Sequence, residues 1–163
     1  MKADESRAGK KIVAIASSTG GPKALQRLIP LLPSNLNAPV MIVQHMPAGF
    51  TEALAGRLNM LSPLAVKEAA EGDVLSQGQV FLARGGRHMK AAKSGARHVI
   101  RYSDEAPREG VRPCANYMYE SLASSCPTMK EILSKTFSPL MVLDRFSTSS
   151  TSLPIPLSGR KSM

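Results

Sequence analysis

Two short apolar segments, each followed by a helical pattern, constrain the fold of this chain most strongly. The segment KIVAIA at residues 11–16 is apolar almost throughout, as is typical of a strand buried on both faces. VMIVQ at residues 40–44 has the same character. Strands that alternate with helices in this way are joined by right-handed crossovers into a parallel sheet. The sequence therefore predicts an α/β, doubly wound, mostly parallel sheet flanked by helices.

Each of these strands precedes a stripe of apolar residues at helical spacing. Pro22 suits the first turn of a helix, where its missing N–H needs no partner. The first stripe stops at Pro33 and the second at Ser62 and Pro63. The stripes consist of Leu25, Leu28, Ile29 and Leu32, and of Phe50, Leu54, Leu58 and Leu61. This spacing predicts one helix from Pro22 to residue 32 and a second over residues 50–61.

Beyond residue 63 the pattern changes to shorter elements. They are strands at 64–69 and 79–83, a small antiparallel hairpin across 87–92 and 97–102, and a helix over 115–125. Residues 1–10 are polar and aperiodic, which predicts a tail or linker remnant. Residues 127–163 hold twelve Ser/Thr and four Pro and predict a divergent, disordered tail. Residues 11–126 remain as one domain.

Charge and composition narrow the class of protein. The net charge of +9 favours acidic partners, but tryptophan is absent and aromatic residues are few, which argues against nucleic acid. Between Arg84 and Arg112, eight Lys/Arg stand against three Asp/Glu, and we interpret this segment as a solvated face or a docking surface for an acidic protein. No apolar run reaches about 18 residues and no leader opens the chain. We therefore expect a cytoplasmic protein without membrane insertion, with Cys114 and Cys126 reduced.

Hydroxyls and glycines follow the first strand in the run Ser17-Ser18-Thr19-Gly20-Gly21, and the second strand ends in Gln44-His45. Because ligands bind at the carboxyl ends of parallel strands, a hydroxyl and an imidazole are expected at one edge of the sheet. Local pattern alone allows three interpretations: a helix cap, a serine nucleophile beside its base, or an anion site at a helix N-terminus. Neither a Walker A loop nor a dinucleotide fingerprint is present.

The chain resembles the catalytic domain of the CheB-type chemotaxis methylesterases, which demethylate glutamates and deamidate glutamines of chemoreceptors. The matching stretches run in family order over about residues 11–126. They are IASSTGGPKAL (15–25), VQHMPAGFTEALAGRL (43–58), EGDVL (71–75), VFLARGGRHM (80–89) and GVRPCANYMY (110–119). The resemblance implies a serine carboxylic ester hydrolase without a cofactor or metal.

By this resemblance Ser18 is the nucleophile and His45 the general base, while Thr19 lies where the oxyanion site is built. Arg112 falls in a segment that lines the family's cleft, which makes it a substrate-side candidate. His88 corresponds to a family histidine near the site, and we interpret it as a structural hydrogen-bonding residue. The resemblance implies chemoreceptor cytoplasmic helices as partner and a monomeric chain. A receiver domain on a separate chain is a further candidate partner.

The chain departs from the family pattern in three places. Ala16-Ser17 stands where the family commonly has Gly-Ala before the nucleophile. The family's third catalytic residue, an aspartate in a glycine-rich segment, has only Asp144 as a weak candidate. The family's last strand and helices are also missing from the pattern after residue 126, which we attribute to a frameshift or truncation. Two alternatives to an active hydrolase follow: a non-catalytic receptor-docking module, and a basic nucleic-acid-binding domain.

Overall fold

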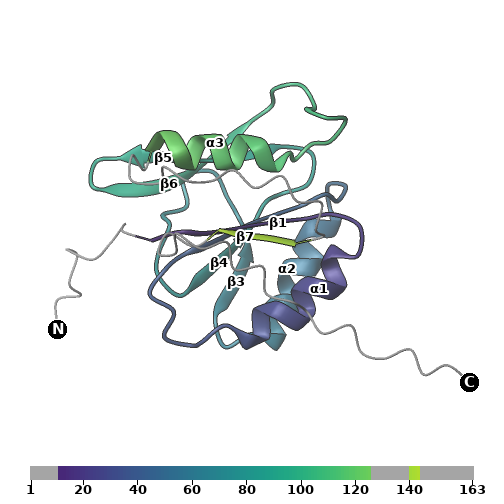
Figure 1. Cartoon of the computed structure of the whole chain (residues 1–163), viewed down its shortest axis with the longest axis vertical. Coiled ribbons are helices and arrows are strands. Elements are labelled where there is room, and N and C mark those ends of the chain that lie inside the picture. Colours follow the sequence, from purple (N-terminus) through teal and green to yellow (C-terminus); the bar gives the residue numbers. More distant parts are fainter. Residues whose placement is uncertain (1–10, 126–139, 144–163) are drawn as a thin grey trace, which may run out of the picture.

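The computed structural model describes residues 11–125 and 140–143. Four parallel strands form the centre of its sheet in the order β3-β4-β2-β1, and β7 pairs antiparallel with the outer edge of β1 (Figure 1). The strands are β1 (Val13–Ser17), β2 (Val40–Gln44), β3 (Ala65–Glu68), β4 (Gln79–Leu82) and β7 (Leu140–Leu143). The predicted α/β class with a mostly parallel sheet is confirmed.

Helices α1 (Gly21–Leu28) and α2 (Phe50–Leu61) cover one face of this sheet (Figure 1). Alternate residues of a strand point to opposite faces, so Ile15 of β1 and Ile42 of β2 meet the two helices. Leu25 and Leu58 are fully buried against them. On the helix side, this apolar layer is formed by residues of the helical stripes predicted from the sequence, such as Leu25 and Leu58.

The opposite face carries the hairpin of β5 (His88–Ser94) and β6 (Arg97–Ser103), with helix α3 (Ala115–Ser125) packed on it (Figure 1). Ser94 pairs with Arg97, so the hairpin turns through two residues, as an antiparallel pair allows. Met41 and Phe81 from the sheet meet Met118 from α3 in a second buried cluster. The predicted hairpin and the helix over 115–125 are confirmed.

The first predicted helix is too long. It ends at Leu28, and the chain continues as a 3₁₀ helix, η2 (Ile29–Leu31). Pro30 explains the change, because its ring lacks an N–H and clashes with the carbonyl of the preceding turn. The second predicted helix is confirmed over residues 50–61, but Phe50 and Leu61 at its ends are exposed and not part of the core.

Strand β7 lies inside the segment for which the sequence predicted no regular structure. β1 has only β2 on its inner edge, so its other edge offers unpaired backbone groups to which a short β-prone segment can bond. Residues 1–10, 126–139 and 144–163, and with them Cys126 and Asp144, lie outside the described residues. Within the described part, no helix is long and apolar enough to cross a membrane.

Candidate active site

Ser18 and His45 meet at the carboxyl ends of β1 and β2. The two strands are parallel neighbours, with Ser17 paired to Gln44, so each chain leaves the sheet at the same edge. The Ser18 Oγ lies 3.1 Å from the Nδ1 of His45, and the hydroxyl-bearing side is open to solvent. The strand-end adjacency predicted from the sequence is therefore present, and its geometry places a hydroxyl within proton-transfer distance of an imidazole.

The hydroxyl run does not cap helix α1, so that interpretation is wrong. The N-cap residue is Gly20, whose φ of 76° lies in the left-handed region, and no side chain makes a capping hydrogen bond there. Instead the backbone turns sharply, and the N–H of Gly21 donates to the carbonyl of Ser18 at 2.7 Å. Thr19 is exposed in this turn, just before the helix N-terminus with its incompletely satisfied N–H groups.

Burial and one carboxylate set the protonation of His45 in opposite directions. Desolvation lowers the pKa of His45 from its ordinary value of 6.5, and the negative charge of Glu109 acts to raise this pKa. Desolvation is the larger effect. Near neutral pH the imidazole is therefore in its neutral form, which is the form that accepts a proton from a hydroxyl.

We expect the ring protons of His45 to titrate, in an NMR experiment, with a midpoint below pH 6.5. Glu109→Gln removes a charge that stabilises the imidazolium, so the midpoint should move to still lower pH. Salt should shrink the difference between the two proteins, because Glu109 is exposed. Glu52→Gln, an exposed change on α2, is the matched control and should leave the midpoint in place. A wild-type midpoint above 6.5 would contradict the assignment of burial as the main cause.

His88 is a structural residue, as the sequence predicted. Its side chain is fully buried at the start of β5. The Nδ1 accepts a hydrogen bond from the N–H of Cys114 at 3.0 Å, and the Nε2 lies 3.1 Å from the carbonyl of Ala106. A nitrogen that accepts from an N–H carries no proton, so the Nε2 donates to Ala106. The ring thereby fastens the loop between β6 and α3 to the hairpin.

Arg112 lies exposed in that same loop. Its guanidinium donates to the carbonyl oxygens of Asp104 and Glu105 at 3.4 and 3.5 Å, and within the described structure these are its hydrogen bonds. Glu109, three residues earlier, is near enough for its charge to act on His45. The loop is thus in electrostatic range of the site, while the direct contacts of Arg112 are to the loop itself.

The basic segment between Arg84 and Arg112 is largely neutralised by carboxylates. Among the described residues, at least five of its eight cations form ion pairs: Arg84 with Glu68, Arg87 with Asp104, Lys90 with Glu105, Arg101 with Glu71 and Arg108 with Glu120. Three of these carboxylates come from outside the segment: Glu68 at the end of β3, Glu71 just after it, and Glu120 in α3. The count of charged residues in the sequence therefore overestimates the positive charge that this segment leaves unpaired.

Asp144, the weak candidate for the third residue of the triad, lies outside the described residues. β7 runs antiparallel to β1, with Leu140 paired to Ser17 and Leu143 paired to Ala14. Within residues 11–125 the acidic side chain whose charge acts on His45 is Glu109, which the sequence reasoning missed. Among the described residues, no three His, Cys, Asp or Glu side chains gather where they could hold a metal ion.

Sequence reasoning also missed Gln44 as a site residue and treated Ser17 as a small neighbour. Gln44 is 2% exposed, and its amide hydrogen-bonds to the Ser17 hydroxyl and to the carbonyls of Ser18 and His45. A polar residue at the end of an otherwise apolar strand was the available signal, because a buried amide needs partners. Which partners it has depends on the register of the two strands.

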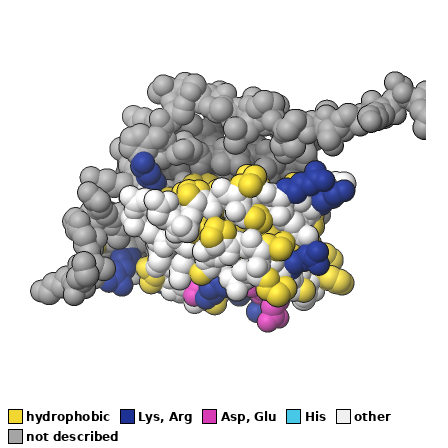
Figure 2. All heavy atoms as spheres, turned by 90° about the horizontal axis from the view of Figure 1, so that it is seen from below, with side chains coloured by type: hydrophobic (Ala, Val, Ile, Leu, Met, Phe, Trp, Pro, Cys, Tyr) yellow, Lys and Arg dark blue, Asp and Glu magenta, His cyan; other side chains and the backbone are white. Residues whose placement is uncertain are grey.

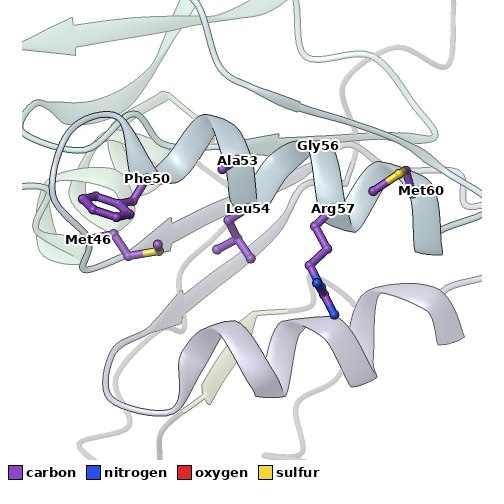
Figure 3. A pocket seen from close by; sticks show the side chains of 7 residues that line it. All are labelled: Met46, Phe50, Ala53, Leu54, Gly56, Arg57 and Met60. Carbon is purple, nitrogen blue, oxygen red and sulfur yellow. The ribbon is translucent and has the colours of Figure 1, made fainter.

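A shallow apolar groove of about 630 Å³ lies along α2 (Figure 3). It is lined by Met46, Phe50, Ala53, Leu54, Gly56, Arg57 and Met60. Neither Ser18 nor His45 lines it, although Met46 follows His45 directly. Figure 2 views the molecule from below Figure 1 and shows a face on which yellow hydrophobic and dark blue basic patches are more extensive than magenta acidic ones. Because neither residue of the Ser18–His45 pair lines it, the groove lies beside the pair and does not contain it.

Comparison with known proteins places this chain in one family. The family model described as CheB methylesterase matches residues 13–136. Proteins named protein-glutamate methylesterase/protein-glutamine glutaminase match from Halalkalibacterium halodurans (45% identity over 115 residues) and Bacillus subtilis (47% over 116 residues). These alignments cover 71% and 70% of this chain but 33% and 32% of the relatives, so the chain spans about a third of their length.

A solved structure agrees with these relatives. The crystal structure of the Thermotoga maritima CheB methylesterase catalytic domain superimposes with a TM-score of 0.70 at 39% sequence identity. The match covers 72% of this chain and 62% of that one.

Proposed function

The chain belongs to the CheB methylesterase family, and on this premise we propose that it is a serine hydrolase that demethylates glutamate methyl esters and deamidates glutamines of chemoreceptors. The observation that carries the proposal is the 3.1 Å contact between the Ser18 Oγ and the His45 Nδ1 at the exposed edge of the sheet. The names of the curated relatives support the same pair of reactions.

In the proposed reaction Ser18 attacks the ester carbonyl of the substrate glutamate. His45, neutral at pH 7 because burial lowers its pKa, takes the hydroxyl proton and returns it to the leaving methanol. Water then attacks the acyl-enzyme with the same histidine as base, which releases the glutamate and regenerates Ser18. With a glutamine side chain the leaving group is ammonia.

The oxyanion of each tetrahedral intermediate needs hydrogen-bond donors that are already in place. We assign this role to the turn at Thr19, which precedes the N-terminus of α1. Arg112 is assigned to the substrate side, since its loop also carries Glu109, whose charge acts on His45. No role is assigned to Asp144, which lies outside the described residues. Among the described residues, the exposed Glu109 is the carboxylate whose charge acts to stabilise the imidazolium.

The proposed partners are the cytoplasmic helices of chemoreceptors, which the enzyme would meet in the cytoplasm. We propose that it acts as a monomer. A receiver domain on a separate chain is the candidate regulator. Acidic receptor helices suit the net charge of +9. Since most cations of the 84–112 segment are paired, the exposed Lys23, Arg27 and Arg57 of α1 and α2 add to the positive surface available.

The test is release of methanol from a receptor peptide that carries glutamate methyl esters, together with release of ammonia from its glutamine form. Both products should appear with this chain alone, and the unmethylated glutamate peptide serves as the blank. Binding of the peptide without either product would favour the non-catalytic docking module. Neither product, together with salt-dependent micromolar binding of DNA or RNA, would favour the nucleic-acid alternative.

A further inference from the structure

A single buried side chain connects the two members of the Ser18–His45 pair. Gln44 ends β2 and is 2% exposed. Its Nε2 donates to the carbonyl of Ser18 at 3.0 Å and also lies 3.3 Å from the carbonyl of His45. Both donor directions of the amide are thus directed at the backbone of the residues that meet in the site. Since these backbone segments come from different loops, the amide fixes the position of one loop relative to the other.

The orientation of this amide is also fixed. The Ser17 Oγ donates to the Oε1 of Gln44 at 2.5 Å, in the buried layer below the site. A flipped amide would direct its oxygen at the carbonyls of Ser18 and His45, where acceptor would face acceptor. The backbone carbonyls and the Ser17 hydroxyl therefore select the same orientation. Ser17 therefore has a role beyond being small: its hydroxyl helps to orient the Gln44 amide.

Gly21 provides the space that the amide occupies. A Cβ at this position would lie 1.8 Å from the Gln44 Oε1 and 2.9 Å from the Ser17 Cβ. Gly21 also donates its N–H to the carbonyl of Ser18, the same oxygen that receives the amide. The glycine is required here by close packing and not by a left-handed backbone, unlike Gly20.

We propose that Gln44 is the positioning residue of the Ser18–His45 pair, with Ser17 orienting its amide and Gly21 making room for it. The inference rests on the proposed function. Gln44 does not touch the reacting atoms; it acts through the backbone of the two residues that do. Because a displacement of about 1 Å can cost about 10²-fold in rate, loss of this link should reduce turnover without affecting substrate affinity.

The test compares Gln44→Ala, Ser17→Ala and Gly21→Ala with the wild-type chain. The readouts are kcat and KM for methanol release, and the rate at which phenylmethylsulfonyl fluoride labels Ser18 with loss of fluoride. Gln44→Ala and Gly21→Ala should lower both kcat and the labelling rate by about 10- to 100-fold, with KM within about twofold. Ser17→Ala removes one hydrogen bond and should cause a smaller loss in the same readouts.

Ser121→Ala is the matched control. Like the Ser17 hydroxyl, the Ser121 hydroxyl donates a hydrogen bond inside the protein, here to the carbonyl of Met118; it also accepts one from the N–H of Ala91, and it lies in the α3 layer. Its loss should lower the melting temperature as Ser17→Ala does and leave Ser18 labelling unchanged. Equal loss of labelling in both variants would overturn the inference, because the effect would then be one of stability.

Wild-type kcat and labelling in folded Gln44→Ala would also overturn it. If Gln44→Ala does not fold, Ser17→Ala and Gly21→Ala decide by the same readouts. If the wild-type chain itself is neither labelled nor active, the proposed function fails, and the inference is judged by the ¹⁵N chemical shift of the His45 Nδ1. A shift changed by Ser17→Ala but not by Ser121→Ala supports positioning, and an unchanged shift refutes it.

Discussion

Replacing Ser18 by alanine is expected to lower methanol release from a methylated receptor peptide by at least about 10³-fold, because it removes the hydroxyl that forms the acyl-enzyme in the proposed reaction. The Ser18 side chain is exposed, and its hydroxyl contacts only the His45 ring among the hydrogen bonds described. The substitution therefore removes little stability, and the thermal melt should be close to that of the wild-type chain. The measurement is kcat/KM for methanol release alongside that melt.

Ser124→Ala makes the same chemical change on α3, where the hydroxyl donates to the carbonyl of Glu120 within the helix. Its rate should equal that of the wild-type chain. If Ser18→Ala retains more than about a tenth of wild-type kcat/KM, the nucleophile assignment is wrong. A loss in both variants would indicate that general damage and not chemistry is being measured.

Gly85→Ala is expected to destabilise the fold by about 3 kcal/mol and to impair the site at the same time. Gly85 lies just beyond β4, under the loop that follows His45. A Cβ there would lie 2.5 Å from the carbonyl carbon and oxygen of Pro47 and 2.6 Å from the carbonyl oxygen of Met46. These are backbone atoms, so the loop itself has to move. Equilibrium unfolding in urea and kcat for methanol release measure the two effects.

Gly56→Ala is the matched control, with the opposite sign. Gly56 lies within α2, and a Cβ there would meet nothing within 4 Å. Alanine is favoured over glycine inside a helix by about 1 kcal/mol, so this variant should be more stable than the wild-type chain. Equal urea midpoints for Gly85→Ala and the wild-type chain would contradict this expectation. They would show that the loop after His45 moves without lowering the free energy of unfolding.

Much of the fold could be read from local pattern. Apolar runs at strand length and stripes at helical spacing depend on neighbouring residues only, so β2 and α2 were located to the residue. The end of α1 was misplaced because the apolar stripe continues past Pro30, whose steric effect on the backbone outweighs the pattern. The strand β7 could not be read from sequence, since its formation depends on the open edge of β1.

The candidate site, like the fold, could be predicted only in part. The pattern at two strand ends predicted that a hydroxyl and an imidazole lie at one edge of the sheet, because parallel crossover connections place such ends together. The family resemblance then identified Ser18 and His45 as the catalytic candidates. The partners of Gln44, the charge of Glu109 on His45 and the ion pairs of the 84–112 segment were not identifiable. Each links residues that only the folding of the chain brings together.

The sequence by itself determined the alternation of strands and helices, the family, and the residue types of the Ser18–His45 pair. Only the tertiary structure decided that Ser17 is a buried donor, that Gly21 must be small, and that Gln44 joins the two loops. The physical reason is register. Pairing Ser17 with Gln44 across two parallel strands directs both side chains to the same face, and a shift by one residue would direct them to opposite faces.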